Sequence, residues 1–348
     1  MELPENVELL RTHVVVERDR VFSVSGSDYP HQYPGISNAW DLEEFKKKFK
    51  VKINRLSQHS IEFDLVGVDA SIANAFRRIL IAEVPTLAIE NVYVMNNTSI
   101  IQDEVLSHRL GLIPIKANPQ LFEYKNSGDL PTDLNTVVFK LKVKCERNPK
   151  AKENETDPKK LYINSHVYSR DLVWEPKGDQ EEKFKDDPIR PVLDDILIAK
   201  LRPGQEIDLE LHCCKGQGRT HAKWSPVATA SYRLLPDIQI LKPITGDDAS
   251  KFQQCFPPGV IDLVTEDGET MAKVVNPRKD TVSREVLRHK EFEGKVRLLR
   301  VRDHFIFNVE TSGAIPPENL FVMAIDVLME KVKAIQPALA RATSNEAA

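Results

Sequence analysis

The chain has 348 residues, of which 41% are hydrophobic and 29% are charged, and its formal net charge is −4. This composition is typical of a soluble globular protein long enough for two domains, and it excludes a disordered chain. The near-neutral charge disfavours a free nucleic-acid-binding protein, because neutralising phosphates takes a basic excess or a basic patch.

Targeting and redox signals are few. The N-terminal MELPENVELLRTH is acidic and shows no secretory signal, and no apolar run reaches the length of a membrane span. Four cysteines in a chain of this length do not make a disulfide framework, so we expect free thiols in a reducing compartment. They are Cys145, Cys213, Cys214 and Cys255.

The first predicted elements are a turn-rich lead-in at 29–35 (YPHQYPG), a short helix at 41–50 and a half-buried strand at 59–68. Asp41 and Glu44 form a capping box for the helix. In the strand, alternation predicts that Ile61, Phe63 and Leu65 face inward and that Glu62 and Asp64 face outward.

The next helix begins at Asp69, ends before Pro85 and has two unlike faces. At 100° per residue, one stripe predicted to face the core holds Ile72, Phe76, Ile79 and Leu80. The opposite side holds Arg77, Arg78 and Ile81. An apolar residue between two guanidinium groups is typical of a protein contact, and the alternative is an ordinary amphipathic helix with one exposed isoleucine.

Strands dominate the rest of the chain. We expect strands at 86–97 and 136–146, two or three more within 194–236, and one at 295–313, with a helix from Asp103 to Gly111 and a weak helix at 247–256. The charged stretch 146–160 is predicted to be a surface loop. Many strands with few helices favour an α+β fold.

A last helix is predicted from about Pro317 to Ile335, and apolar residues cover more than half of its circumference. One core contact needs a narrower stripe, so we expect one face on the chain's own sheet and another on a partner subunit. The alternative is a helix enclosed within one large domain. The residues assigned to the partner face are Val322, Ile325, Met329 and Val332.

No catalytic motif is found. The loop at 215–219 (KGQGR) leaves open a phosphate-binding site, and hence a stand-alone enzyme acting on a phosphorylated substrate, although a hairpin connection is the simpler interpretation. His212, Cys213 and Cys214 are adjacent, so their side chains diverge, and we expect no metal site and no cofactor there. The same divergence argues against acid–base catalysis by the pairs His108–Arg109 and Asp303–His304 and against a metal dyad at Asp194–Asp195.

Four segments carry a family likeness: 72–90 (IANAFRRILIAEVPTLAIE), 96–115 (NNTSIIQDEVLSHRLGLIPI), 221–236 (HAKWSPVATASYRLLP) and 309–332 (VETSGAIPPENLFVMAIDVLMEKV). They resemble the α-like subunits of DNA-directed RNA polymerases. The segments 190–238, 276–285 and 296–310 are most similar to the larger α-like subunit shared by nuclear polymerases I and III. The equivalent subunit of polymerase II or of an archaeal polymerase is the alternative within the family.

The resemblance implies a discontinuous dimerisation domain at 49–87 and 232–335, an inserted β-rich domain at 88–231, an N-terminal extension at 1–48 and a C-terminal tail at 336–348. It implies a non-catalytic assembly subunit that pairs with a small α-like subunit and docks the second-largest subunit through Phe76, Arg77 and Arg78. It also implies other polymerase I and III subunits as neighbours, a nuclear location including the nucleolus, no membrane and no specific DNA contact.

One departure separates this chain from some relatives. The polymerase II counterpart and several archaeal relatives carry a metal-binding cysteine cluster in the inserted domain, whereas this chain has Cys145 and then the distant Cys213 and Cys214. The metal function is therefore not carried over, and the departure favours the polymerase I and III branch.

Overall fold

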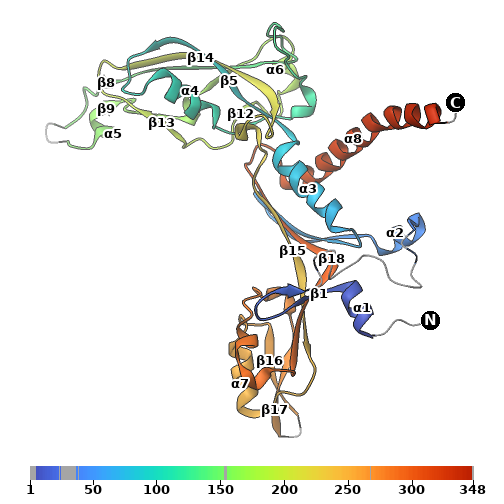
Figure 1. Cartoon of the computed structure of the whole chain (residues 1–348). Coiled ribbons are helices and arrows are strands. Elements are labelled where there is room, and N and C mark those ends of the chain that lie inside the picture. Colours follow the sequence, from blue (N-terminus) through green and yellow to red (C-terminus); the bar gives the residue numbers. More distant parts are fainter. Residues whose placement is uncertain are drawn as a thin grey trace. The chain divides into compact units, whose positions relative to one another are not determined.

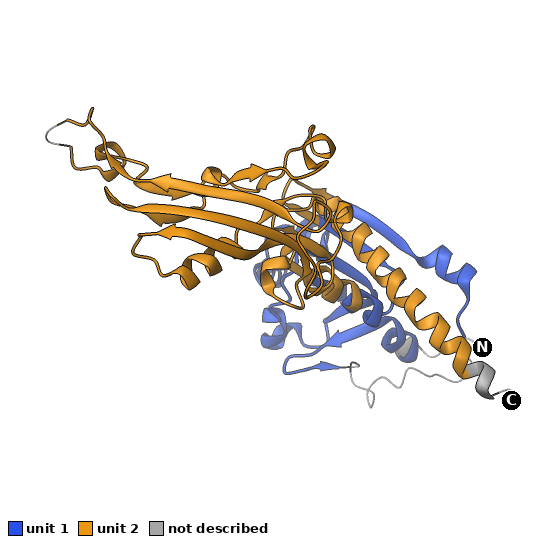
Figure 2. Ribbon diagram, turned by 90° about the horizontal axis from the view of Figure 1, so that it is seen from above, with its two compact units in different colours: residues 1–54, 62–74, 231–308 blue, residues 55–61, 75–230, 309–348 orange. Residues whose placement is uncertain are grey.

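The computed structural model describes residues 5–22, 24, 37, 39–152, 155–266 and 268–346, and the predicted lead-in at 29–35 lies outside them. Helices and sheets are both abundant, which confirms the α+β class (Figure 1). Two compact units emerge from contacts within the chain (Figure 2). Unit 1 comprises 1–54, 62–74 and 231–308, and unit 2 comprises 55–61, 75–230 and 309–348. Within the described residues, no helix is long and apolar enough to cross a membrane.

Unit 1 is built on an antiparallel sheet in the order β2-β1-β18-β4-β3, with β15 also paired to β18. The strands are β1 (His13–Val16), β2 (Val21–Phe22), β3 (Lys50–Leu56), β4 (Ser60–Val66), β15 (Val227–Ile240) and β18 (Val296–Thr311). The hairpin of β16 (Ile261–Glu266) and β17 (Glu269–Val274) and the helix α7 (Gly246–Gln254) add a second core around Phe252 and Phe292. The weak helix predicted at 247–256 is thus confirmed.

Strand β4 follows the predicted alternation at every position but one. Ile61, Phe63 and Leu65 are buried as expected, but Asp64, predicted to face solvent, is only 5% exposed. The prediction for Asp64 was wrong because a cation from a distant segment covers the other face of the strand: Arg278 donates hydrogen bonds to both carboxylate oxygens. Alternation alone carries no information about such a partner.

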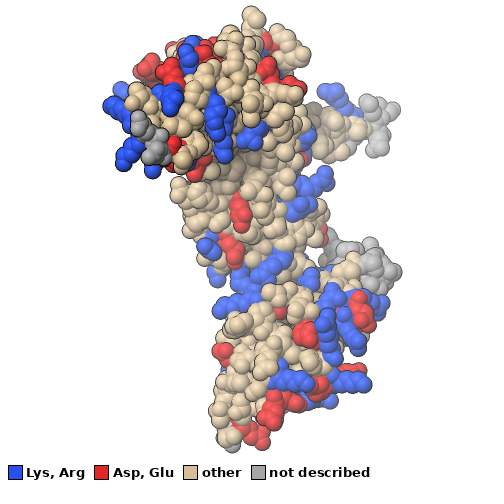
Figure 3. Space-filling view, turned by 90° about the vertical axis from the view of Figure 1, so that its left-hand side faces the viewer, with Lys and Arg blue, Asp and Glu red and all other residues tan. Residues whose placement is uncertain are grey.

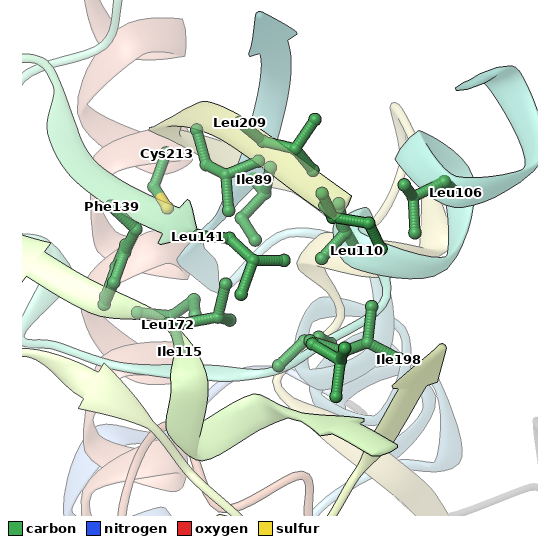
Figure 4. Packing of buried hydrophobic residues seen from close by; sticks show 14 of the residues in the cluster. Ile89, Leu106, Leu110, Ile115, Phe139, Leu141, Leu172, Ile198, Leu209 and Cys213 are labelled. Carbon is green, nitrogen blue, oxygen red and sulfur yellow. The ribbon is translucent and has the colours of Figure 1, made fainter. Parts of the chain in front are cut away.

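Unit 2 contains a four-stranded antiparallel sheet in the order β11-β7-β14-β5. Its strands are β5 (Pro85–Asn97), β7 (Val137–Lys144), β11 (Val173–Glu175) and β14 (Glu206–Gln217). Helix α4 (Asp103–Gly111) packs Leu106 and Leu110 into the core cluster of this unit, which also holds Leu209 and Cys213 (Figure 4). The predicted strands at 86–97 and 136–146 and the helix at 103–111 are confirmed.

Two longer helices carry the predicted interface; α8 belongs to unit 2, as does α3 from Ala75 onward. Helix α3 (Ala70–Ala82) matches its prediction, except that Ile72, placed on the core stripe, is 42% exposed. Its position in the first turn leaves it short of the packing that covers Phe76, Ile79 and Leu80. Helix α8 (Pro317–Glu346) continues well beyond the predicted end at Ile335, with Pro337 inside it.

The remaining elements are short. The predicted surface loop at 146–160 holds two small ones, β8 (Glu146–Arg147) and the first residues of α5 (Pro158–Leu161). The other helices are α1 (Glu5–Thr12), α2 (Leu42–Lys48), which has Asp41 as its N-cap, and α6 (Gln180–Lys183). The other strands are β6 (Ile115–Lys116), β9 (Tyr162–Ile163), β10 (His166–Tyr168), β12 (Arg190–Pro191) and β13 (Leu197–Lys200). Short 3₁₀ turns are η1 (Pro119–Leu121), η2 (Ser169–Asp171), η3 (Ala222–Trp224), η4 (Pro277–Lys279), η5 (Glu285–Arg288) and η6 (Lys290–Phe292).

Candidate partner interface

The inner side of α3 packs against the start of α8. Phe76, Ile79 and Leu80 are buried, and the rings of Phe76 and Phe321 lie 5.0 Å apart in a tilted arrangement. Leu320 and Ala324 of α8 are also buried. An aromatic pair of this kind stabilises the packing by about 1 kcal/mol beyond its buried area. Phe76, predicted to contact a partner, is therefore used within the chain.

The outer side of α3 is exposed to different degrees. Arg78 is exposed and Ile81 is 37% exposed, whereas Arg77 is half-buried and engaged in an interaction within the chain. Hence the surface that α3 offers to another protein consists chiefly of Arg78 and Ile81. Desolvating an isoleucine beside a planar guanidinium group is a common way to build an interface.

An ion pair joins the end of α3 to the middle of α8. The Nζ atom of Lys331 lies 2.7 Å from Oε2 of Glu83. Both side chains retain contact with water, so this pair is worth about 1 kcal/mol or less. Its main effect is to favour one orientation of α8 relative to the turn that follows α3.

Helix α8 exposes a continuous row of apolar side chains. Val322, Ile325, Met329 and Val332 follow one another at intervals of three, four and three residues, and all four are exposed. This spacing keeps a seam on one side of a helix, as in coiled coils. Every described side chain from Lys331 to Ala342 is exposed as well.

Sequence reasoning missed part of this seam. Ile335 and Leu339, which are 64% and 62% exposed, continue it beyond Val332. The prediction ended the helix at about Ile335, whereas α8 continues through Pro337, a residue that cannot donate an i→i−4 hydrogen bond. The signal that reveals the longer seam is the spacing of Val332, Ile335 and Leu339 at intervals of three and four residues, which runs past the proline.

The glycine-bearing loop at 215–219 has a packing role. A Cβ atom at Gly216 would lie 2.4 Å from the Trp224 ring, and one at Gly218 would lie 2.4 Å from the carbonyl oxygen of Ile81. Both glycines are thus required for close approach. Lys215 donates to the carbonyl of Phe122, and burial lowers the pKa of its ammonium group. This arrangement gives no support to a phosphate-binding loop.

The other polar candidates do not converge on a reaction centre. Cys213 is fully buried, burial raises the pKa of its thiol, and His212 contacts Glu210 at 3.0 Å. Arg109 donates to the carbonyls of Leu197 and Ile198. Across the described part of the chain, no group of three or more His, Cys, Asp or Glu side chains is placed to hold a metal ion.

The side chains of the pairs Asp303–His304 and Asp194–Asp195 do not converge on a common site. His304 contacts Asp64, with 3.1 Å between Nε2 and Oδ2, whereas the carbonyl oxygen of Asp303 accepts a hydrogen bond from Gly67. Asp194 and Asp195 are exposed. On the face drawn in Figure 3, basic and acidic side chains are interspersed.

Comparison of the chain with known protein families gives a match that includes these helices. The model of the RNA polymerase Rpb3/Rpb11 dimerisation domain matches residues 62–332, a range that begins in β4 and ends within the α8 seam. The chain belongs to this family. The match spans well over half of the sequence, and its range includes all of α3 and the first half of α8.

Relatives within the family differ in their degree of similarity. The bovine (Bos taurus) protein named DNA-directed RNA polymerases I and III subunit RPAC1 is 55% identical over 95% of this chain and 96% of its own length. The Saccharomyces cerevisiae protein of that name is 54% identical over 92% of this chain and 96% of its own. The Dictyostelium discoideum protein named DNA-directed RNA polymerase II subunit rpb3 is 31% identical over 86% of this chain and 97% of its own length. Similarity is therefore much higher to the polymerase I and III members.

Proposed function

We propose that this chain is the larger α-like subunit shared by nuclear RNA polymerases I and III, which synthesise ribosomal and small RNAs. The identity of 54–55% to members named for these two enzymes, against 31% for a polymerase II member, supports this branch. The chain acts in assembly, and the catalytic centre belongs to other subunits. Its place of action is the nucleus, including the nucleolus, where polymerase I works.

The exposed seam of α8 carries the proposal of a heterodimer. Val322, Ile325, Met329 and Val332 present contiguous apolar surface on a helix whose opposite side is buried at Leu320 and Ala324. Contiguous exposed apolar surface marks interaction sites, and obligate dimer interfaces resemble a core cut in half. The smaller α-like subunit covers this seam with a helix of its own.

Co-expression with the smaller α-like subunit tests the heterodimer. A stable one-to-one complex is expected, and Met329→Glu combined with Val332→Glu should weaken it at least a hundredfold, because two carboxylates would be buried without partners. Ala338→Glu, on the exposed part of α8 but outside the seam by helical spacing, is the matched control and should bind normally. Normal binding by the double variant would refute the assignment.

The outer side of α3 is proposed to dock the second-largest subunit. Arg78 supplies a charged fork and Ile81 an apolar contact next to it. Ile81→Asp or Arg78→Glu should leave folding and heterodimer formation intact but reduce recovery of the second-largest subunit in pull-downs. Ile72→Asp makes the same chemical change on the opposite side of α3 and serves as the control. Equal losses from both aspartate variants would argue against a specific docking face.

The domain division at 49–87 with 232–335, and 88–231, remains part of this proposal. It assigns α3 and α8 together to dimerisation and leaves the β14 sheet to the inserted domain. Limited proteolysis of the heterodimer tests it. Bound partner should protect α8 from cleavage, while loops within 88–231 stay equally accessible in the free chain and the complex. Protection spread evenly over both regions would contradict the division.

A further inference from the structure

Strand β3 is an edge strand without cover. It is the last strand in the sheet order of unit 1, and all seven of its residues are exposed. Among the described strands, its outer side therefore has no hydrogen-bonding neighbour. A free edge is a template for pairing with another chain, and proteins usually keep such edges short, bulged or covered.

Apolar side chains follow this edge. Val51 and Ile53 are 45% and 56% exposed, and alternation places them on the same face of β3. Just before the strand, the exposed Phe49 stacks on Phe45 with 5.2 Å between ring centroids, and Trp40 lies 5.0 Å from Phe45. The exposed strand is thus continued by an exposed aromatic row.

The beginning of β3 is held rigidly. The N–H of Phe49 donates to the carbonyl of Phe45 at 2.8 Å, which closes α2. Gly67, at φ +79°, lets the end of β4 approach so closely that a Cβ atom there would lie 2.6 Å from the carbonyl oxygen of Lys48. The edge is therefore presented in one conformation, which lowers the entropic cost of binding to it.

The charge along this segment has a single sign. Between Phe45 and Ile61 the sequence has six basic residues and no acidic one. Lys46 and Lys48 pair with Glu43 and Glu44, whereas the ammonium groups of Lys50 and Lys52 make no hydrogen bond or ion pair to a described residue. Lysines on an edge repel basic strands and are costly to desolvate against a neutral one, so beside exposed Val51 and Ile53 they leave an acidic strand as the complementary occupant.

We propose that β3 is the docking site for an acidic, extended segment of another polypeptide. The segment adds to the sheet as a neighbouring strand, with main-chain hydrogen bonds along the free edge, apolar side chains over Val51 and Ile53, and carboxylates near Lys50 and Lys52. None of the residues assigned to the α3 or α8 surfaces takes part. The inference therefore stands apart from the proposed function.

Photo-cross-linking of the native assembly tests this site. The full chain, with p-benzoylphenylalanine in place of Ile53, is purified with its partners from its own cells, irradiated and analysed by mass spectrometry. The expected product joins position 53 to an acidic segment of a different polypeptide. A cross-link to residues 23–38 of this chain, a cross-link to a neutral or basic segment, or no cross-link would each overturn the proposal.

Charge reversal provides the second test. Lys50→Glu with Lys52→Glu should reduce the cross-linked product at least tenfold, and reversing the acidic residues found in the captured segment should restore it. Lys183→Glu with Lys185→Glu, at exposed lysines with the same spacing in unit 2, is the matched control. Unchanged cross-linking in the β3 variant would refute the electrostatic match. Recovery of the other polymerase subunits is scored in the same samples, so that failure here is distinguishable from failure of the proposed function.

Discussion

Arg278 and Asp64 form a bidentate ion pair, with the Nη1 atom of Arg278 2.7 Å and 2.9 Å from the two carboxylate oxygens of Asp64. The other terminal nitrogen of Arg278 donates to Glu62 at 2.6 Å. The Nδ2 atom of Asn54 also donates to Asp64, at 2.9 Å. A single planar guanidinium group thus ties the segment 276–285 to strand β4.

Removing this guanidinium should destabilise unit 1. In Arg278→Met, Asp64 stays buried without its partner, so the free energy of unfolding should fall by about 3 kcal/mol. The stability of Arg278→Lys should lie between those of the wild type and Arg278→Met, because an ammonium group keeps the charge but cannot reach both carboxylates as the planar guanidinium fork does. Urea denaturation measures both. Asp64→Asn combined with Arg278→Met should recover part of the loss, and a double variant as unstable as the sum of the singles would contradict the pairing.

The same contact predicts acid sensitivity. Burial opposes the charged form of Asp64, but the hydrogen bonds from Arg278 and the nearby His304 ring outweigh it and hold the pKa of this carboxyl below its usual value of 3.8. A carboxyl with a depressed folded-state pKa stabilises the fold above its unfolded pKa and loses that contribution as the pH falls through the folded one. Stability should therefore decline below about pH 4. In Asp64→Asn this part of the decline should be absent from urea titrations at pH 3 to 5.

The ion pair between Glu83 and Lys331 should contribute little by itself. Because both side chains are partly exposed, a double-mutant cycle with Glu83→Gln and Lys331→Met should give a coupling energy of about 0.5 kcal/mol, and less at high salt. Thermal unfolding of the four proteins at two salt concentrations measures it. A coupling above about 2 kcal/mol would show that α8 depends on this pair more than exposed pairs allow.

Gly216 should resist replacement by alanine. The added methyl group would lie 2.4 Å from the indole ring of Trp224, whose Nε1 donates to the carbonyl of Cys214 at 3.0 Å. Moving that ring should cost about 1–3 kcal/mol, as overpacking usually does. The melting temperature and near-ultraviolet circular dichroism of tryptophan report the change. Wild-type values for both would contradict the close approach.

The thiols should be unreactive in the folded chain. All four cysteines are buried, and burial raises the pKa of Cys145, Cys213, Cys214 and Cys255, so little thiolate is present at pH 7. Ellman's reagent should react slowly with the native chain and promptly with four thiols after unfolding in guanidinium. A thiol that reacts at once in the native chain would place it at the surface.

The sequence by itself determined the α+β class, most long elements and the family. Start and stop residues were sufficient for α4, and alternation was sufficient for the buried apolar positions of β4, because a strand that covers a core repeats its apolar residues at every second position. The FRR and HRLGLIP segments identified the polymerase family, since long specific motifs carry more information than composition does.

Only the tertiary structure decided which polar and apolar side chains are covered. Asp64 is buried because Arg278, more than two hundred residues away, reaches it, and Ile72 is exposed although its stripe was predicted to face the core. The continuation of α8 through Pro337 was not predicted from the sequence, and neither was the free edge of β3 among the described strands. Burial depends on contacts between distant segments, whereas periodicity reports only the geometry of one segment, and that difference separates what could be predicted here from what could not.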